Sequence, residues 1–338
     1  MLSSIMAIRK ILAIKFKFLG DVAIMVPALR LLRQNYPDAE IHVLVANEAV
    51  DILQDIPWID KAWGFPRKRG KAQIKAAFPI IRQLRREKFD LSVDFVGNDR
   101  GAFLSLAVGA KMRIGSISPL GFWGRKYCYN KRVLEANEGL HEIERNVHVL
   151  SPLGLDLRDS INLAPELHIY RHHDYAEAIL PPKAVLCHLS TSMPKKEWPV
   201  DKWLALYENN PQLQSRMVFS TGPSQREKAL LADLKQKNPS VLTIKDIPDV
   251  AHFMALIKTA DTIICGDSLP SHLAAGLGTK QIVLFGPTPL HQWHPKGRNT
   301  IVLHAGNCDC FGHPHVCHKS PPCMASISPE EVASYIEA

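Results

Sequence analysis

Residues 261–287, DTIICGDSLPSHLAAGLGTKQIVLFGP, decide the fold of this chain. An apolar stretch at 262–265 runs into Gly266, Asp267 and Ser268, and a second apolar stretch at 281–285 ends at a Gly-Pro pair. Two buried strands joined by a short helix predict a parallel βαβ unit. The turn from strand to helix directs backbone N–H groups and the positive helix end at one point, which suits a phosphate or pyrophosphate.

Asp267 lies within this turn, and its carboxylate would repel a phosphate. We therefore expect it to accept hydrogen bonds as a helix cap or to bind a hydroxyl group of a ligand. An ordinary capped turn without a ligand is the simpler interpretation of the same residues, and the rest of the chain has to decide between the two.

The bulk composition is that of a soluble globular protein, with 46% apolar and 22% charged residues among 338. This length accommodates two domains of about 150 residues each. Lys and Arg (41) exceed Asp and Glu (33), which favours an acidic partner such as a nucleotide, a nucleic acid or an anionic membrane face. No apolar run reaches the roughly 20 residues that span a bilayer, and no signal peptide is evident, so we expect a cytoplasmic location.

Apolar strands alternate with amphipathic helices in both halves of the chain. The first half has expected strands at 11–16, 41–46, 59–65, 91–95 and 112–114 and helices at 21–34, 73–86, 102–108 and 142–150. The second half has expected strands at 185–188, 217–220 and 241–244 and helices at 201–207, 225–234 and 250–258, followed by the stretch quoted above.

This alternation predicts an α/β protein with two Rossmann-like domains facing across a cleft, each with a mostly parallel sheet. We assign residues 1–165 to the first domain, 166–182 to a linker and 183–327 to the second domain. Residues 328–338 form a terminal helix that can cross back to the first domain.

Ligands of such sheets bind at the carboxyl ends of the strands, so the loops that follow strands are the candidate sites. Gly20 and Asp21 open the first helix, where Asp21 is either a cap or a carboxylate that removes a proton from a hydroxyl group. The loop at 188–199 carries hydroxyl groups and two lysines, and the loop at 220–225 is a Gly-Pro turn. The absence of G-x-G-x-x-G and G-x-x-x-x-G-K-[ST] disfavours dehydrogenases and P-loop NTPases.

Three motifs occur together, in order. They are Gly20-Asp21-Val22 with Pro27-Ala28-Leu29; Lys196-Glu197-Trp198-Pro199 with Trp203; and 266–279 (GDSLPSHLAAGLGT) with Phe285-Gly286-Pro287-Thr288. In these motifs the chain resembles, nearly end to end, the glycosyltransferases that transfer heptose from ADP-heptose to the lipopolysaccharide core (glycosyltransferase family 9).

The resemblance implies a GT-B fold, with the acceptor bound by the first domain and the nucleotide sugar mainly by the second. It implies an inverting single displacement that needs no metal and no cofactor. Asp21 matches the proposed base and Lys196 the residue that contacts the donor phosphate. The donor-binding positions implied by the match are Thr191, Ser192, Asp267, Ser268, Leu269, Ser271 and His272.

Two positions depart from the family pattern. Leu269 replaces a glycine in the donor turn, and a leucine resists positive φ, so the turn has to be built differently or never needed that conformation. The family glutamate after the Gly-Pro turn is replaced by Gln225, with Glu227 two residues on. Either side chain can serve the ribose or adenine.

Basic residues follow strands in the first half, and they fit the acidic sugars and phosphates of a lipid-linked acceptor. The acceptor-binding candidates are Arg67, Arg69, Arg100 and Arg125. The net charge of +8 also favours peripheral contact with an anionic inner membrane. We expect no nucleic-acid partner, because no helix-turn-helix pattern and no interleaving of aromatic and basic residues accompany the basic run at 67–71. Solvated surface loops are the alternative interpretation.

The cysteines form two groups. Cys187 and Cys265 lie in apolar strands and are expected to be buried thiols. A cluster near the end of the chain has the spacing C-x-C-x₆-C-x₅-C, which lacks the C-x₂-C pairs of strong zinc sites. We predict no metal, with a zinc site at Cys308, Cys310, Cys317 and Cys323 as the alternative.

Other functions stay open at this stage. A nucleotide- or polyanion-binding module without chemistry is one alternative, although it would need no base such as Asp21 beside Lys196. A nucleotide-sugar epimerase, or a transferase that uses another nucleotide sugar, is the other. The sequence fixes neither the acceptor sugar nor the core position.

Overall fold

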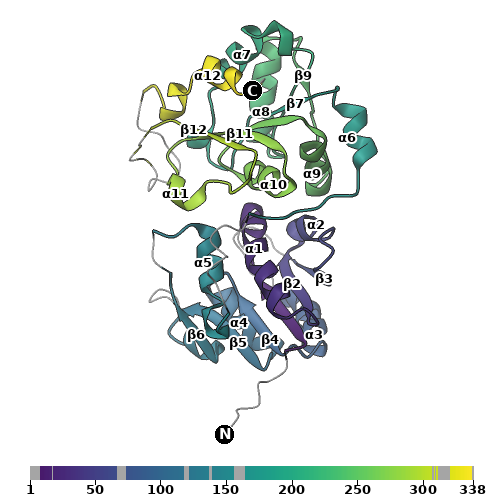
Figure 1. Ribbon diagram of the computed structural model, residues 1–338, viewed down its shortest axis with the longest axis vertical. Helices are drawn as coiled ribbons and strands as arrows, with labels where there is room; N and C mark the ends of the chain where they lie inside the picture. Colours follow the sequence, from purple (N-terminus) through teal and green to yellow (C-terminus); the bar gives the residue numbers. More distant parts are fainter. Residues whose placement is uncertain are drawn as a thin grey trace. The chain divides into compact units, whose positions relative to one another are not determined.

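The computed structural model describes residues 8–16, 18–66, 74–117, 122–136, 139–155, 164–306, 308, 310 and 320–336. The chain forms two compact units, Met1–Leu163 and Ala164–Ala338, here called the first and second units (Figure 1). In the described part of the chain, no helix combines the length and the hydropathy needed to cross a membrane.

The first unit contains a parallel sheet with six strands in its described residues, in the order β3-β2-β1-β4-β5-β6 (Figure 1). The strands are β1 Lys10–Ile14, β2 Glu40–Ala46, β3 Lys61–Phe65, β4 Leu91–Asp94, β5 Met112–Ile117 and β6 Lys131–Leu134. The helices are α1 Leu19–Asn35, α2 Val50–Leu53, α3 Ile74–Arg86, α4 Asp99–Val108 and α5 Glu142–His148.

The second unit repeats this strand order as β9-β8-β7-β10-β11-β12, again parallel and with six strands among the described residues. The strands are β7 Val185–His188, β8 Met217–Ser220, β9 Leu242–Thr243, β10 Thr262–Gly266, β11 Lys280–Phe285 and β12 Thr300–His304. The helices are α6 His173–Ile179, α7 Val200–Glu208, α8 Gln225–Lys237, α9 Val250–Thr259, α10 Leu269–Leu277, α11 Leu290–Trp293 and α12 Pro329–Ser334.

Central strands of both sheets are buried on both faces, which explains their unbroken apolar sequences. In β1, Ile11 pairs in register with Ile41 of β2 and with Leu91 of β4, and all three side chains are fully buried. The second unit has a core around Trp203 and Phe219, with helices packed over the sheet. The predicted α/β class with two Rossmann-like parallel sheets is confirmed.

Two strands and three helices differ from the sequence-based expectation, and two of these helices, α2 and α11, have only four residues each. Edge strands β6 and β12 were not predicted, because their burial is partial and their sequences mix polar with apolar residues. Helix α6 lies inside the expected linker 166–182 and packs against α9. The boundary between the two units, after Leu163, lies near the expected domain end at 165.

The terminal helix α12 packs against α7 of the second unit. Its Val332 and the following Ile336 are buried in the core of that unit. The apolar side chains of the terminal helix thus anchor it in the second unit, and its expected return to the first domain stays a prediction.

Candidate functional site

The strand order of the second unit places two predicted loops side by side. Strands β7 and β10 are neighbours, paired from Thr262 opposite Val185 to Cys265 opposite His188. The chain continues from β7 to β8 toward one edge of the sheet and from β10 to β11 toward the other edge. The carboxyl ends of β7 and β10 are therefore the topological switch point, where ligands of open α/β sheets bind. The loops 189–197 and 267–268 both begin there.

An ion pair joins these two loops. Lys196 Nζ lies 2.7 Å from Asp267 Oδ2, and the two side chains are 16% and 4% exposed. A carboxylate that is nearly buried needs such a partner, because removing it from water without compensation is costly. The structure thus brings together two of the predicted residues, and Asp267 holds the Lys196 ammonium at the switch point.

Helix α10 begins immediately after Asp267. Ser268 is its N-cap in an extended conformation (φ −163°), and its side chain makes no cap hydrogen bond. Leu269 is the first residue of the helix, and no positive φ occurs there among the described residues. The family glycine is therefore not required at this position for backbone reasons. Ser271 and His272 are both buried in the first turn.

The loop after β7 is held by a network that the sequence did not predict. The Thr191 N–H donates to Glu197 Oε1 at 2.9 Å, and the Thr191 hydroxyl donates to the Met193 carbonyl at 2.7 Å. Arg226 from α8 donates to both carboxylate oxygens of Glu197, each at 2.9 Å, and to the Thr191 carbonyl. Both bonds to Glu197 come from the same nitrogen, Nη1, and Nη2 donates to the Thr191 carbonyl, so one guanidinium ties the loop at two points. Ser192, also predicted, is exposed on this loop.

Gly266, the last residue of β10, allows this loop to approach the strand end. A Cβ atom built on it would lie 2.8 Å from Thr191 Cγ2 and 3.2 Å from the Lys196 carbonyl oxygen. Only a residue without a side chain permits this approach without moving the loop.

The third predicted loop contains both candidates for the missing family glutamate. Glu227 forms a capping box with Ser224 at the start of α8. Its carboxylate also lies over Gly222, where a Cβ atom would come within 2.3 Å of Oε1. Gln225 is exposed at the first position of the helix. Of the two, Glu227 is the one whose side chain turns back over the loop.

A buried histidine connects the second and third loops. His188 Nδ1 lies 3.0 Å from the Ser220 hydroxyl, and the Ser190 hydroxyl accepts from the Gly222 N–H at 2.8 Å. Burial lowers the pKa of His188 to about 4, because the surrounding core disfavours the charged ring. The imidazole is therefore neutral near pH 7.

Two hydroxyl groups at strand ends lack a partner. Thr221 follows β8 and Thr288 follows the Gly-Pro pair after β11; they are 7% and 3% exposed. Among the side chains that the structure describes, both Oγ1 atoms are buried without a hydrogen bond. A buried hydroxyl group without a partner is costly, so these two are candidates to bind a ligand. Thr221 lies in the candidate loop 220–225 and Thr288 in the motif that ends the second strand of 261–287, but neither was singled out as a site residue.

In the first unit, Asp21 lies at the third position of α1 and is 4% exposed. Its Oδ2 accepts from the Phe18 N–H at 3.1 Å. The capping interpretation is thus correct for one oxygen. The carboxylate also sits at the carboxyl end of β1, as a catalytic base on this sheet would.

Lys15, which follows β1, is 1% exposed and connects three elements. Its ammonium donates to the Phe95 carbonyl at 3.1 Å and to Asn146 Oδ1 of α5 at 2.9 Å. Asp94, at the end of β4, accepts from the Tyr129 hydroxyl at 2.6 Å. Complete burial raises the pKa of Asp94 to about 6, and the hydrogen bonds from Tyr129 and the Val96 N–H oppose this rise.

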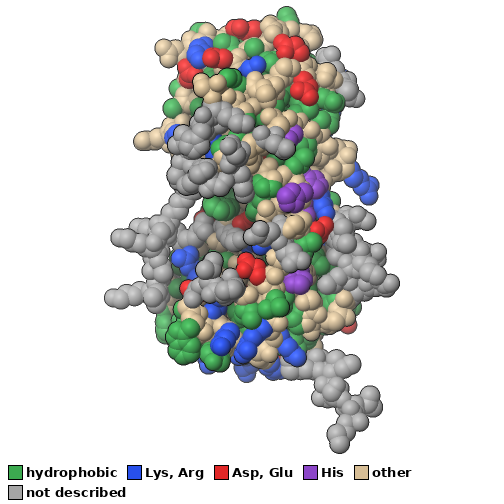
Figure 2. Space-filling view, turned by 90° about the vertical axis from the view of Figure 1, so that its left-hand side faces the viewer, with side chains coloured by type: hydrophobic (Ala, Val, Ile, Leu, Met, Phe, Trp, Pro, Cys, Tyr) green, Lys and Arg blue, Asp and Glu red, His purple; other side chains and the backbone are tan. Residues whose placement is uncertain are grey.

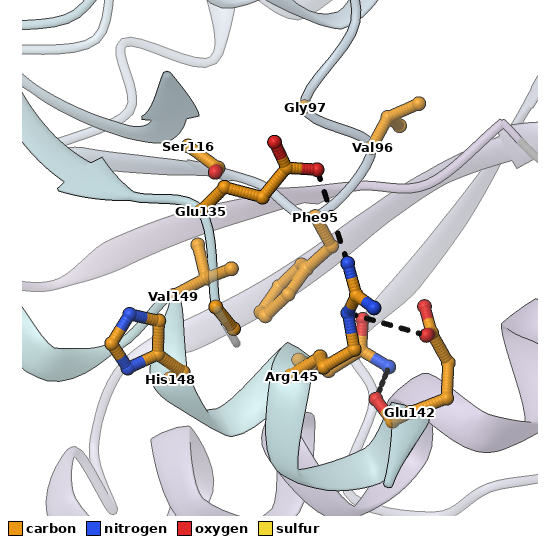
Figure 3. A pocket seen from close by; sticks show the side chains of 11 residues that line it. Phe95, Val96, Gly97, Ser116, Glu135, Glu142, Arg145, His148 and Val149 are labelled. Carbon is orange, nitrogen blue, oxygen red and sulfur yellow. Dashed lines mark hydrogen bonds and ion pairs between the residues drawn. The ribbon is translucent and has the colours of Figure 1, made fainter. Parts of the chain in front are cut away.

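A small polar cavity opens beside these residues, at the ends of β4, β5 and β6 (Figure 3). Its volume is about 80 Å³, which accommodates a few water molecules. Arg145 of α5 points into it and pairs with Glu142 at 3.6 Å and Glu135 at 3.9 Å (Figure 3). The cation of this cavity is therefore already neutralised by two carboxylates.

The predicted acceptor-binding arginines have different surroundings. Arg100 lies in the first turn of α4 and is partly exposed. Arg125 is buried, donates to the Gly97 carbonyl at 2.9 Å and lies 3.7 Å from Asp99. Arg67 and Arg69 lie outside the described residues.

The cysteine predictions concern two regions. Cys187 and Cys265 are fully buried, as expected, and burial raises the pKa of both thiols. The sulfur atoms of Cys308 and Cys310 lie 3.1 Å apart. Cys317, the third member of the expected cluster, lies outside the described residues, so the zinc alternative stays a prediction.

A different group of metal-binding residue types does occur. In the described residues, His172, Asp249 and His252 have ligand atoms within 4.8 Å of one another. The two imidazole rings are stacked, with centroids 3.7 Å apart and planes inclined by 20°. Stacked rings direct their lone pairs along parallel lines instead of to one point, so this arrangement is not that of a metal site.

The sequence model of glycosyltransferase family 9 (heptosyltransferase) matches residues 77–319. The chain is 28% identical over 301 residues to lipopolysaccharide heptosyltransferase 3 of Escherichia coli, covering 86% of this chain and 87% of that relative.

Two solved structures share the fold. One is a glycosyl transferase family 9 protein from Veillonella parvula, with TM-score 0.80 and 18% identity over 97% of this chain and 96% of the other. The second is the E. coli ADP-heptose lps heptosyltransferase II, with TM-score 0.77 and 18% identity over 97% of both chains. At these identities the structural likeness concerns the fold, and it agrees with the predicted GT-B type.

Proposed function

Since the chain belongs to glycosyltransferase family 9 (heptosyltransferase), we propose that it transfers heptose from ADP-heptose to the inner core of lipopolysaccharide. The acceptor is Kdo-lipid A or an already heptosylated core. The single observation that carries the donor side of this proposal is the Lys196–Asp267 pair, 2.7 Å long, at the start of α10. An ammonium and a helix N-terminus at one point suit a diphosphate.

The second unit supplies the donor contacts in this proposal. Lys196 and the first turn of α10 hold the diphosphate, while Asp267 positions the ammonium and accepts from a ribose hydroxyl. Glu227 takes the role of the family glutamate, since its carboxylate lies over Gly222 at the loop after β8. The unpartnered hydroxyl groups of Thr221 and Thr288 add two polar contacts at neighbouring strand ends.

The first unit supplies the base. An acceptor hydroxyl oxygen forms the new bond to the anomeric carbon of heptose while the bond from that carbon to the diphosphate oxygen breaks. The electron pair of the broken bond leaves with ADP, where Lys196 offsets its charge. The proton of the acceptor hydroxyl passes to Asp21. Attack opposite the leaving group inverts the anomeric configuration, and the step draws on no metal.

The experiment that tests this function is release of ADP from ADP-heptose by the purified protein, with and without a truncated core acceptor. We expect acceptor-dependent release in the wild type and a loss of about 10²- to 10⁴-fold in Asp21→Asn. Asparagine keeps an oxygen for the Phe18 N–H, so the α1 cap survives and the loss reports on chemistry. Asp38→Ala, which removes an exposed carboxylate after α1, is the matched control.

Other outcomes contradict the proposal. Tight donor binding without release for any core acceptor would indicate a binding module. Turnover of the donor without acceptor would indicate an epimerase or a hydrolase. Failure to bind ADP-heptose, with binding of another nucleotide sugar, would show that the donor is a different one.

We further propose that the enzyme acts in the cytoplasm, in peripheral contact with the anionic face of the inner membrane. The net charge of +8 supports this location, since anionic lipids attract basic surfaces. A lipid-linked acceptor also requires that the enzyme reach the membrane surface.

A further inference from the structure

We propose that the first unit docks on anionic lipid bilayers through Phe122, Trp123, Lys126, Tyr127 and Arg132, here called the aromatic-basic patch. This inference rests on the proposed function in one respect, namely that the acceptor is lipid-linked. The docking itself is a property of the surface and is testable without donor or acceptor.

The patch is unusually apolar for an exposed surface. Trp123 is 84% exposed, Tyr127 58% and Phe122 46%. The Trp123 and Tyr127 rings contact each other edge to face, with centroids 6.2 Å apart. Single exposed aromatic residues are common, but three within six residues form a contiguous surface that requires a partner.

Cations surround the aromatic rings. Lys126 Nζ lies 5.2 Å and Arg132 Cζ 5.9 Å from the centroid of the Tyr127 ring. In the described part of the chain neither of these two cations pairs with a carboxylate, so their charges are available to an anionic partner. Figure 2 shows Lys, Arg and hydrophobic side chains gathered on the face of the first unit that it presents.

The nearest acidic side chains are already engaged. Asp99 accepts from the Phe122 N–H at 3.3 Å and lies 3.7 Å from Arg125. Glu135 lies 3.9 Å from Arg145. The patch therefore carries a local positive charge, which complements anionic lipid headgroups.

The scaffold below the patch is firmly packed. Phe122, Trp123, Lys126 and Tyr127 come from the 3₁₀ helix Arg125–Cys128 and the two residues before its N-cap, Gly124. This helix packs on α4, and Cys128 and Tyr129 form a small buried cluster with Ala102. A Cβ on Gly124 would lie 2.6 Å from the Phe122 ring, so the glycine allows the ring to fold over the turn. Rigid presentation lowers the entropic cost of docking.

The chemistry of the patch favours a lipid surface over other partners. Trp and Tyr combine an apolar ring with a polar atom and concentrate at membrane interfaces, while Lys and Arg extend to the headgroups. Exposed Leu134 continues the apolar surface two residues beyond Arg132 on β6. The membrane is also where the lipid-linked acceptor of the proposed function resides.

The test is cosedimentation of the full-length protein with phosphatidylglycerol vesicles, compared with phosphatidylcholine vesicles, in the absence of donor and acceptor. We expect binding to the anionic vesicles that weakens with salt. Trp123→Glu with Tyr127→Glu should weaken it at least tenfold. Lys126→Gln and Arg132→Gln should each weaken it about fivefold. Tyr170→Glu, which changes a 71% exposed aromatic residue of the second unit, should bind as the wild type does.

The outcomes separate this inference from the proposed function. Equal binding by wild type and the Trp123→Glu Tyr127→Glu variant overturns it, as does a wild type that ignores anionic vesicles. It is also overturned if the variant changes only self-association or single-stranded RNA binding. ADP release with a delipidated core oligosaccharide should be the same in variant and wild type, which shows that the variant is folded. If neither the wild type nor the variant transfers sugar, the difference in vesicle binding still supports the docking surface, and only the proposed function is contradicted.

Discussion

At the scale of single residues, two adjacent lysines show how the fold gives identical side chains different tasks. Lys195 is 5% exposed and donates to the Cys310 carbonyl at 2.6 Å. Lys196 points the other way and pairs with Asp267. The sequence identified a basic loop and, through a motif, Lys196. The structural task of Lys195 depends on a carbonyl more than a hundred residues away, which no local pattern reveals.

We predict that Lys196→Met lowers kcat for ADP release about 10²- to 10³-fold, because the charge on the departing diphosphate loses its ammonium. Thermal stability should fall as well, because Asp267, which is 4% exposed, loses the ammonium that pairs with it. Steady-state kinetics and a melting curve check both parts. Lys202→Met, a partly exposed lysine on α7, serves as the matched control. A kcat loss in Lys202→Met of similar size would contradict the assignment.

We predict that Tyr129→Phe destabilises the first unit by about 1–3 kcal/mol, because Asp94 loses the donor 2.6 Å from its oxygen. The folded pKa of Asp94 is raised to about 6, so its carboxyl group is ionised at pH 8 and largely protonated at pH 5. A hydrogen bond to the ionised form is the stronger one, so the loss should be larger at pH 8. Urea unfolding at both pH values measures it, and an equal or reversed loss would refute the argument.

At the scale of elements, sequence periodicity located the central strands, because a strand buried on both faces is an unbroken apolar run. Edge strand β6 was not predicted for the opposite reason, since three of its four residues are exposed and its sequence has no apolar run. The candidate loops were found because they follow predicted strands. The Arg226–Glu197 bridge that holds one of them was not, because it joins a loop to a helix that is distant in sequence.

We predict that Gly266→Ala weakens ADP binding at least tenfold. The new Cβ would lie 2.8 Å from Thr191 Cγ2 and 3.2 Å from the Lys196 carbonyl, so the loop after β7 has to shift. Small displacements of positioning groups cost large factors in binding and rate. Gly276→Ala is the control, since its Cβ would crowd Leu167 at 2.6 Å near the other end of α10. Calorimetric titration with ADP should detect weak binding in Gly266→Ala alone; unchanged affinity there would show that the loop position is irrelevant.

At the scale of the whole molecule, the two units contain buried groups with opposite pH responses. The folded pKa of Asp94 is raised to about 6, so the first unit gains stability as the pH falls through that value. The folded pKa of His188 is lowered to about 4, so the second unit loses stability as the pH falls below the ordinary histidine value of about 6.5.

We predict that lowering the pH from 7 to 5 stabilises the first unit by about 1 kcal/mol through Asp94 and destabilises the second by about 2 kcal/mol through His188. His42 in the first unit, whose pKa is lowered by burial, opposes the Asp94 contribution. Calorimetric scans at the two pH values should therefore compare the wild type with Asp94→Asn, and the first transition of the wild type should show the more favourable shift at pH 5. In His188→Gln the second transition should become nearly independent of pH over this range. If the second transition of His188→Gln keeps its pH dependence, groups other than His188 cause that dependence.

The repeated strand order has a consequence for how specificity can change. Both sheets read 3-2-1-4-5-6 in their own numbering, and the chain passes from one unit to the other a single time, after Leu163. Each unit thus has its own sheet and its own core, and can be exchanged as one continuous segment of the chain. Under the proposed function, a chimaera that exchanges the first unit should change the sugar that is extended, while the second unit continues to select the nucleotide.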